Sequence, residues 1–201
     1  MRVEHGEREP QGVWRGPIAT TPTVSAAILW TWIYQPDFGI LNFALKQIGV
    51  HGPQWLGSPT WAMPAVMVMG VWQSLGYSIV ILLAGLQNIS REYYEAASID
   101  GASVFQRFAH ITMPLLSPAI FFVLVLSIIN AFQVFTSVFV MTGGGPANST
   151  LTVVMYLYQA AFQHQDMGAA AAMAYCLFAV LAGLTALNFY LQRLWVFYEE
   201  R

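Results

Sequence analysis

The residues that could perform catalysis do not form a catalytic pattern in this sequence. Glu95 and Asp100 could be taken for a general acid and base, but no nucleophilic side chain has a base beside it. His110 and His164 are isolated histidines, and a single cysteine, Cys176, allows neither an internal disulfide nor a cysteine-rich metal site. We therefore expect a protein that is not an enzyme and has no catalytic residues, metal site or cofactor.

A second group of polar residues offers hydrogen bonds rather than covalent chemistry. Ser127, Asn130, Gln133 and Ser137 fall within an arc of about 120° on one helix, given 3.6 residues per turn. Such a stripe could present hydroxyl and amide groups to a polar solute that passes along the helix. It could also form hydrogen bonds between packed membrane helices. Both interpretations remain open, and one stripe could serve both roles.

The composition places these residues in a membrane protein. The chain has 201 residues, of which 57% are hydrophobic and only 9% are charged, against about 25% charged in an average soluble domain. A net charge of -2 provides no attraction for nucleic acid, and seven Trp residues suit a chain whose rings lie near lipid headgroups. We expect a protein that is embedded in the lipid bilayer and does not bind nucleic acid.

Four uncharged segments are candidate membrane spans, since a helix needs about 20 apolar residues to cross roughly 30 Å of hydrocarbon. Residues 61–87, 115–141 and 168–191 are strong candidates, whereas 17–35 is marginal because Pro22 and several hydroxyl residues interrupt its apolar run. Residues 151–163 are apolar but too short to cross, which predicts an interfacial or re-entrant segment. The predicted fold is an all-α, polytopic bundle of membrane helices.

The basic residues predict the orientation, because Lys and Arg concentrate in cytoplasmic loops. One side of the membrane holds the polar tail 1–16, the 88–114 connection and the C-terminus with its tail 196–201. Seven of the eight basic residues lie on that side: Arg2, Arg8, Arg15, Arg91, Arg107, Arg193 and Arg201. Both termini are therefore predicted to be cytoplasmic, with loops 36–60 and 142–167 outside the cell.

The cytoplasmic 88–114 connection is predicted to form two short helices around a glycine. Ser90 can cap the first helix, and Gly101 lies where a left-handed residue would end it. Ser103 begins the second helix with a capping box, and Pro114 is expected to close that helix before the next span. Large apolar side chains lie along this bend: Tyr93, Tyr94, Val104, Phe105 and Phe108. They indicate either a segment that rests in the headgroup layer or a docking site for a protein partner.

The spacing within this connection resembles the EAA loop of binding-protein-dependent ABC importers. The Glu-Ala-Ala triplet at 95–97 is separated from Gly101 by three residues, and Ile111 and Pro114 complete the pattern. Three other segments look like the sugar and glycerol-phosphate permease branch of that superfamily: WTWIYQPDFGILN, WLGSPTWAMPAV and MTGGGPANST. The resemblance covers roughly residues 18–195.

This resemblance implies a permease of the ABC type I importer kind in the plasma (inner) membrane of a prokaryote, with residues 17–195 as its transmembrane domain. In that family the loop docks into a cleft on cytoplasmic ATPase subunits, so ATP hydrolysis is expected on separate chains. The residues then expected to contact the ATPase are Glu95, Ala96, Ala97, Asp100 and Gly101. Because the helix after the loop faces the translocation path in that family, Ser127, Asn130 and Gln133 are expected to line a substrate pathway.

The resemblance further implies a second permease subunit and an extracytoplasmic solute-binding protein, with a sugar or related polar solute as cargo. Such permeases usually carry further spanning helices at their N-terminus, whereas residues 1–16 match no known motif. A truncated permease without independent activity is therefore one alternative. A non-transporting membrane scaffold, whose loop rests on lipid, is the other.

Overall fold

A computed structural model describes residues 22–197, and no β-strand occurs among them. The all-α prediction is therefore confirmed for this part of the chain. The polar tail 1–16, the start of the predicted span 17–35 and most of the tail 196–201 lie outside the described residues. Four of the seven arginines used to predict the orientation lie there too: Arg2, Arg8, Arg15 and Arg201.

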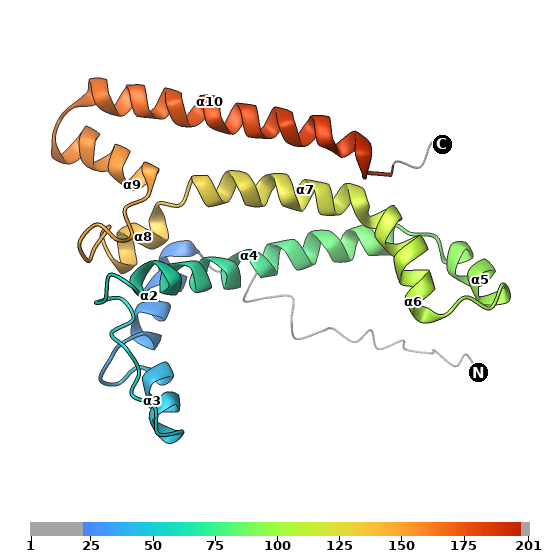
Figure 1. The fold of residues 1–201 in the computed structure, drawn as a ribbon, viewed down its shortest axis with the longest axis horizontal. Coiled ribbons are helices and arrows are strands. Elements are labelled where there is room, and N and C mark those ends of the chain that lie inside the picture. The colour runs from blue at the N-terminus through green and yellow to red at the C-terminus, as the bar shows by residue number, and fades with distance from the viewer. Residues whose placement is uncertain (1–21, 198–201) are drawn as a thin grey trace, which may run out of the picture.

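Three long apolar helices form the body of the molecule. They are α4 (Ala62–Gln87), a continuous helix over Val104–Phe132, and a helix over Met167–Leu194 that comprises α10 (Met167–Leu191) and the 3₁₀ turn η3 (Gln192–Leu194). Each is longer than the roughly 20 residues needed to cross a bilayer. α4 packs on α7, and α10 packs on the other side of α7 (Figure 1). The three helices overlap the three strong candidate spans.

The Val104–Phe132 helix, called here the 104–132 helix, differs from the sequence prediction because it continues through Pro114. It consists of α6 (Val104–Arg107), the π-helical turn η1 (Phe108–Thr112) and α7 (Met113–Phe132). In the π turn the Met113 N–H bonds to the Phe108 carbonyl, five residues back. The change of hydrogen-bond register in this wider turn leaves room for the ring of Pro114, which would clash in a regular α-helix.

The predicted span 115–141 also needs correction, because it is not one helix. α7 ends at Phe132, and a second short helix, α8 (Thr136–Met141), follows after a break. The Thr152 hydroxyl donates a hydrogen bond to the Val134 carbonyl within that break, at 2.8 Å. A tertiary contact of this kind leaves no trace in the hydropathy pattern, so the apolar run alone predicts a longer helix.

The end of the molecule opposite the 88–114 connection is built from shorter helices (Figure 1). They are α2 (Thr23–Ile33), α3 (Ile40–Gln47), α8, α9 (Val153–Tyr158) and the π-helical turn η2 (Gln159–Gln163). The main apolar core lies here, between α2, α4 and α8, with Ala27, Met69 and Val138 fully buried. Below about 12 residues these helices depend on such packing for stability.

An aromatic cluster reinforces this core. The rings of Trp30, Tyr34, Trp55, Trp61 and Trp72 follow one another with centroids 5.4 to 5.9 Å apart, within the range of favourable aromatic pairs. The Tyr34 hydroxyl donates to the Ala65 carbonyl of α4 at 2.9 Å. The cluster thus joins α2 and the 36–60 loop to the end of α4.

The contact between α4 and α7 depends on the absence of a side chain at Gly85. A Cβ atom there would meet the Leu116 Cδ1 at 2.8 Å and the Ala119 Cβ at 2.9 Å. The leucine can change its conformation, but the alanine Cβ can move only with the backbone. Gly70 provides a matched position on the same helix, because a Cβ there would meet nothing within 4 Å.

We therefore expect opposite effects from two identical substitutions in α4. Gly85→Ala should lower the free energy of unfolding by about 1–3 kcal/mol through overpacking. Gly70→Ala should leave it unchanged or raise it by about 0.5–1 kcal/mol, because alanine favours the helix. Thermal unfolding of both variants in the same detergent measures the difference. Equal stability of the two variants would show that α4 and α7 are not in close contact at Gly85.

Candidate functional site

The first half of the 88–114 connection is the short helix α5 (Arg91–Ile99), whose two ends are both capped. At its start the Ser90 hydroxyl accepts a hydrogen bond from the Glu92 N–H at 3.3 Å. At its end Gly101 has a φ of 75°, a left-handed conformation that favours glycine. The predicted cap and the predicted left-handed glycine are confirmed.

The turn at Gly101 has the hydrogen bonds of a Schellman motif. The Ala102 N–H donates to the Ala97 carbonyl at 2.9 Å, and the Gly101 N–H donates to the Ser98 carbonyl at 3.2 Å. These bonds satisfy two carbonyls that the end of a helix would otherwise leave unpaired. The triplet at 95–97 is thereby tied to the glycine that follows it.

The predicted capping box opens the second helix of the bend. The Ser103 N–H donates to the Gln106 Oε1 at 2.8 Å, and the Gln106 N–H donates to the Ser103 hydroxyl at 3.3 Å. Both partners of the motif are present, so the prediction is confirmed. The helix that begins here is the 104–132 helix, which runs on into the predicted span without interruption.

Two side-chain contacts fix the angle between α5 and the 104–132 helix. The Arg107 Nη1 donates to the Ser98 hydroxyl at 2.8 Å, and the Tyr94 and Thr112 hydroxyls share a hydrogen bond at 2.9 Å. Sequence reasoning did not identify these pairs, because their partners lie 9 and 18 residues apart and on different helices, which meet only through the turn at Gly101. The bend is therefore a preformed unit with a defined shape.

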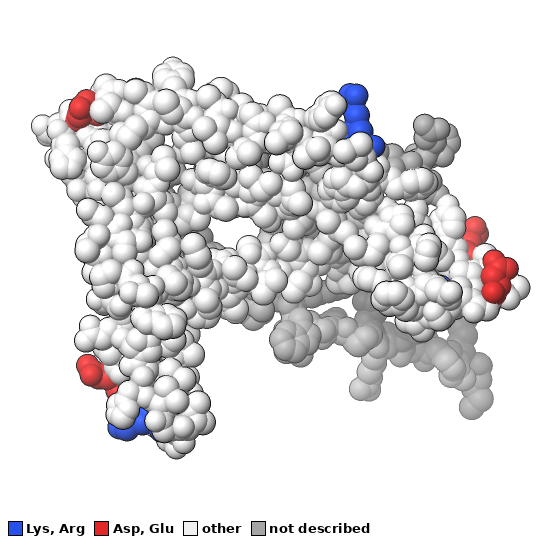
Figure 2. All heavy atoms as spheres, in the orientation of Figure 1, with Lys and Arg blue, Asp and Glu red and all other residues white. Residues whose placement is uncertain are grey.

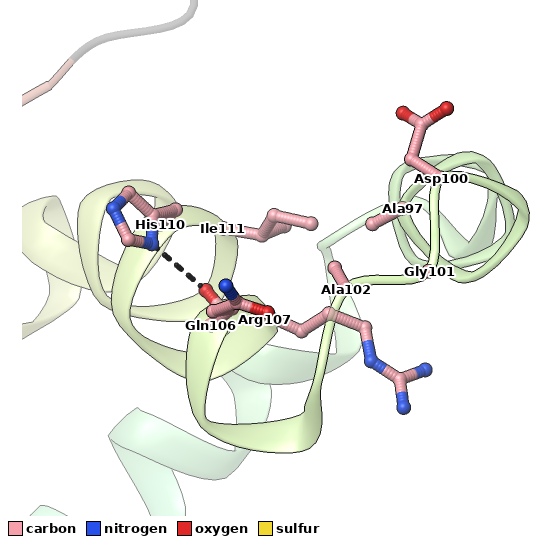
Figure 3. Close-up of a pocket in the computed structure, with 8 residues that line it drawn as sticks. All are labelled: Ala97, Asp100, Gly101, Ala102, Gln106, Arg107, His110 and Ile111. Carbon is pink, nitrogen blue, oxygen red and sulfur yellow. Dashed lines mark hydrogen bonds between the residues drawn. The ribbon is translucent and has the colours of Figure 1, made fainter.

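An open pocket of about 340 Å³ lies between α5 and the start of the 104–132 helix. Figure 3 shows Ala97 and Ile111 pointing toward each other across it, while the carboxylate of Asp100 points away. The lining residues are Ala97, Asp100, Gly101, Ala102, Gln106, Arg107, His110 and Ile111. Three of the five residues predicted to contact an ATPase therefore line this pocket, and the other two, Glu95 and Ala96, are exposed on α5 beside it.

The tip of the bend leaves large apolar side chains uncovered. Ile99 is 88% exposed, Phe105 is 78% exposed and Val104 is 76% exposed. Figure 2 shows acidic side chains at the same end of the molecule. An apolar tip beside acidic groups is typical of a surface that meets another molecule. The sequence did not identify Ile99 as part of this apolar surface. It is the last residue of α5, and the hydrophobic pattern does not indicate whether a side chain at that position is covered.

A second, larger cavity of about 780 Å³ runs along α4 and α7, at the end of the 104–132 helix far from the bend. The predicted stripe of Ser127, Asn130, Gln133 and Ser137 lines it, so the structure brings these four residues to one cavity. This cavity is called here the α4–α7 groove. Neither Ser127 nor Asn130 makes a side-chain hydrogen bond to another helix in the part of the chain that the structure describes.

α4 adds polar residues to the groove that sequence reasoning missed: Gln73, Ser74, Tyr77 and Ser78. The Ser74 and Ser78 hydroxyls donate to carbonyls of their own helix at 2.9 Å and can still accept hydrogen bonds. The Gln73 Nε2 donates to the Thr23 hydroxyl of α2 at 2.9 Å. A polar stripe on this span could have been predicted from the spacing of these residues. Gln73 and Tyr77, like Ser74 and Ser78, are four positions apart and so lie on one face of a helix.

The other candidates for chemistry stay apart. Within residues 22–197 no group of three or more His, Cys, Asp or Glu side chains could hold a metal ion. The Nδ1 of His110 lies 3.1 Å from the Gln106 carbonyl of its own helix, and Cys176 is exposed on α10. Glu95 and Asp100 are exposed on the bend, away from any buried site.

Comparison with known proteins finds membrane components of transport systems. The family described as "Binding-protein-dependent transport system inner membrane component" matches residues 18–195. The sulfoquinovosyl glycerol transport system permease protein SmoG of Agrobacterium fabrum is 38% identical over 165 residues, which is 82% of this chain and 54% of SmoG. The sn-glycerol-3-phosphate transport system permease protein UgpA of Yersinia pseudotuberculosis is 35% identical over 188 residues, 93% of this chain and 63% of UgpA.

A third relative and a solved structure extend the comparison. The trehalose/maltose transport system permease protein MalF of Thermococcus litoralis is 40% identical over 147 residues, 73% of this chain and 48% of MalF. A bacterial ABC transporter involved in the import of the acidic polysaccharide alginate has a chain with the same fold, with a TM-score of 0.79 at 24% identity over 87% of this chain and 62% of that chain. This chain thus spans about half to two thirds of the length of the proteins it matches.

Proposed function

We propose, from the premise that the chain belongs to the family of binding-protein-dependent transport system inner membrane components, that it is a permease subunit of an ABC importer for a sugar or related polar solute. One observation carries the proposal. A single helix, Val104–Phe132, begins with the second half of the exposed bend and carries Ser127 and Asn130 of the polar stripe near its other end, just before Gln133. A displacement of the bend is thereby transmitted to the groove.

The bend is proposed to contact cytoplasmic ATPase subunits, which hydrolyse ATP on separate chains. Glu95, Ala96, Ala97, Asp100 and Gly101 are the proposed contact residues. The support is that the exposed apolar tip lies beside a pocket that the two helices leave open. The cap at Ser90, the turn at Gly101 and the Arg107–Ser98 bond give the bend a fixed shape before any partner binds.

The α4–α7 groove is proposed to form one wall of the solute pathway. Ser127, Asn130 and Gln133 would offer hydroxyl and amide groups to a sugar. A second permease subunit would supply the opposite wall. This is supported by the exposure of the helices: only 17% of the apolar window of α4, and 17% of that of the 104–132 helix, is buried inside the described chain.

An extracytoplasmic solute-binding protein is proposed to deliver the solute to loops 36–60 and 142–167. In Figure 1, α3 of the first loop projects sideways from the long helices, at the end opposite the bend. Uncovered apolar side chains lie on α3 and beside it, among them Phe38, Phe43 and Ile48. The solved alginate ABC transporter has also been crystallised in complex with a pentasaccharide-bound periplasmic protein, which is the same kind of partner.

The turn at Gly101 provides the direct test of coupling. Nothing lies within 4 Å of a Cβ atom at this position, so any penalty comes from the left-handed backbone alone. Gly101→Val should distort the bend at a cost of about 1–2 kcal/mol, whereas Gly101→Asn should be better tolerated because asparagine adopts this conformation more readily. We expect the valine variant to co-purify with less ATPase subunit and to lose uptake, with the asparagine variant intermediate.

The assay is mild detergent extraction of the chain co-expressed with a candidate ABC ATPase subunit, followed by uptake of a panel of sugars in cells at matched membrane abundance. Normal ATPase attachment and uptake in Gly101→Val would remove the coupling role from this bend. A wild-type chain that forms a stable oligomer without any ATPase would instead favour the scaffold.

The orientation is tested by thiol labelling at two positions of similar exposure. Phe105 in the bend is 78% exposed and Phe38 in the first outer loop is 72% exposed. In a Cys176→Ser background, which removes the native thiol, we expect Phe38→Cys to react with an impermeant maleimide in intact cells. Phe105→Cys should react only after the membrane is opened. The reverse pattern would overturn both the orientation and the docking role of the bend.

The role of the groove is tested by two asparagines in long apolar helices. Asn130 lines the groove, whereas Asn188 lies on α10 and donates to the Leu184 carbonyl of its own helix at 2.9 Å. Removing a partner of a bound polar group costs about 1–3 kcal/mol, or roughly 5- to 150-fold in affinity. Asn130→Ala should therefore impair uptake of some sugars more than others, and Asn188→Ala should affect all sugars alike. A uniform loss in Asn130→Ala that follows its membrane abundance would assign the stripe to helix packing.

A further inference from the structure

Ser117 lies in the second turn of α7, just beyond the bend, and is only 3% exposed. Its hydroxyl has two hydrogen-bond partners. It donates to the Pro114 carbonyl at 2.6 Å and accepts from the Phe197 backbone N–H at 2.8 Å. The second bond joins residues 80 positions apart in the chain. A single buried hydroxyl therefore connects the 104–132 helix to the segment that follows α10.

The Pro114 carbonyl needs this partner because of the residue four positions further on. In a regular helix it would accept from the N–H of residue 118, but Pro118 has none. The Phe197 N–H lies beyond the last helical turn, η3 (Gln192–Leu194), and has no helical partner either. The Ser117 hydroxyl donates to the Pro114 carbonyl and accepts from the Phe197 N–H, so that both groups are paired.

Aromatic contacts surround this hydrogen bond. The ring of Phe121, one turn after Ser117 on α7, lies 5.3 Å from the ring of Phe189 and 6.1 Å from that of Trp195. These contacts matter because α10 has little other support: only 6% of its apolar window is buried inside the described chain. Its opposite end packs on α9 and η2. The end of α10 nearest the bend is thus held to the 104–132 helix chiefly around Ser117.

We propose that Ser117 is a positioning residue for transport: it holds residues 195–197 to the start of α7, so that a displacement of the bend moves α10 together with the 104–132 helix. This inference rests on the proposed function. Without the Ser117 hydroxyl, the bend still moves α7, but the near end of α10 no longer follows it. ATP hydrolysis then continues, but less solute is transported for each ATP hydrolysed.

Three variants separate this role from the simpler one of pairing the Pro114 carbonyl, which Pro118 leaves without a backbone partner. Ser117→Ala removes both hydrogen bonds. Ser117→Ala combined with Pro118→Ala restores a backbone N–H for the Pro114 carbonyl and leaves only the Phe197 N–H without its partner. Ser117→Thr keeps the hydroxyl, and a threonine hydroxyl in a helix can bond the preceding turn.

The readouts are ATP hydrolysed per solute transported, in the assembled transporter, and amide hydrogen exchange of residues 194–197, which requires no transport. In Ser117→Ala and in the double variant we expect exchange at Phe197 to rise by about 5- to 150-fold, as for the loss of a buried hydrogen bond. The ATP cost per solute should rise at least about threefold in both variants. Ser117→Thr should restore both quantities toward wild type.

Two results would overturn the positioning role. If the double variant keeps the wild-type ATP cost per solute, Ser117 serves only to pair the Pro114 carbonyl. If uptake and ATP hydrolysis both fall in proportion to the amount of protein in the membrane, Ser117 has a purely structural role. If the wild-type assembly lacks ATP-driven uptake, the proposed function fails, and the positioning role fails with it. The hydrogen-exchange result then still reports whether the Ser117–Phe197 bond exists.

Discussion

The structure depends on one continuous ladder of backbone hydrogen bonds through a helix that contains two prolines. In a membrane, water cannot satisfy an exposed carbonyl, so each interruption of the ladder has to be repaired by the protein. The π-helical turn before Met113 accommodates Pro114, and the Ser117 hydroxyl pairs the carbonyl that Pro118 leaves open. Because both repairs are local, the helix stays whole from Val104 to Phe132. Without them, the bend and the groove would be separate structures joined by a flexible break.

The same constraint explains where the chain does leave its helices. In the break after Phe132, the hydroxyl of Thr152, the residue before α9, donates to the Val134 carbonyl. In the 36–60 loop, the Asn42 side chain donates to the Pro36 and Pro53 carbonyls and accepts from the Trp55 indole N–H. Irregular backbone at this end of the bundle is therefore paired by side chains that lie 6 to 18 positions away in the chain. Its shape is held by polar contacts as well as by the apolar core.

The sequence predicted those features that arise from neighbouring residues. The Ser90 cap, the left-handed Gly101 and the Ser103–Gln106 capping box each depend on a few consecutive positions, and all three are present. The prediction that Pro114 ends the helix was wrong, because a π turn is a change of hydrogen-bond register that hydropathy does not report. The break after Phe132 and the contacts of Arg107 and Ser117 likewise depend on tertiary partners.

The distribution of polar side chains also decides which face of the bundle can meet lipid. An amide without a hydrogen-bond partner costs about 4–8 kcal/mol in hydrocarbon, so the α4–α7 groove, with Asn130 in its lining, cannot face acyl chains. α10 presents the opposite case, since its Asn188 is paired within its own helix and its remaining surface is largely apolar and exposed. α10 is thus compatible with lipid, and the groove requires water or another protein surface. This asymmetry is what the proposed arrangement needs, in which α10 faces lipid and the groove faces a second subunit.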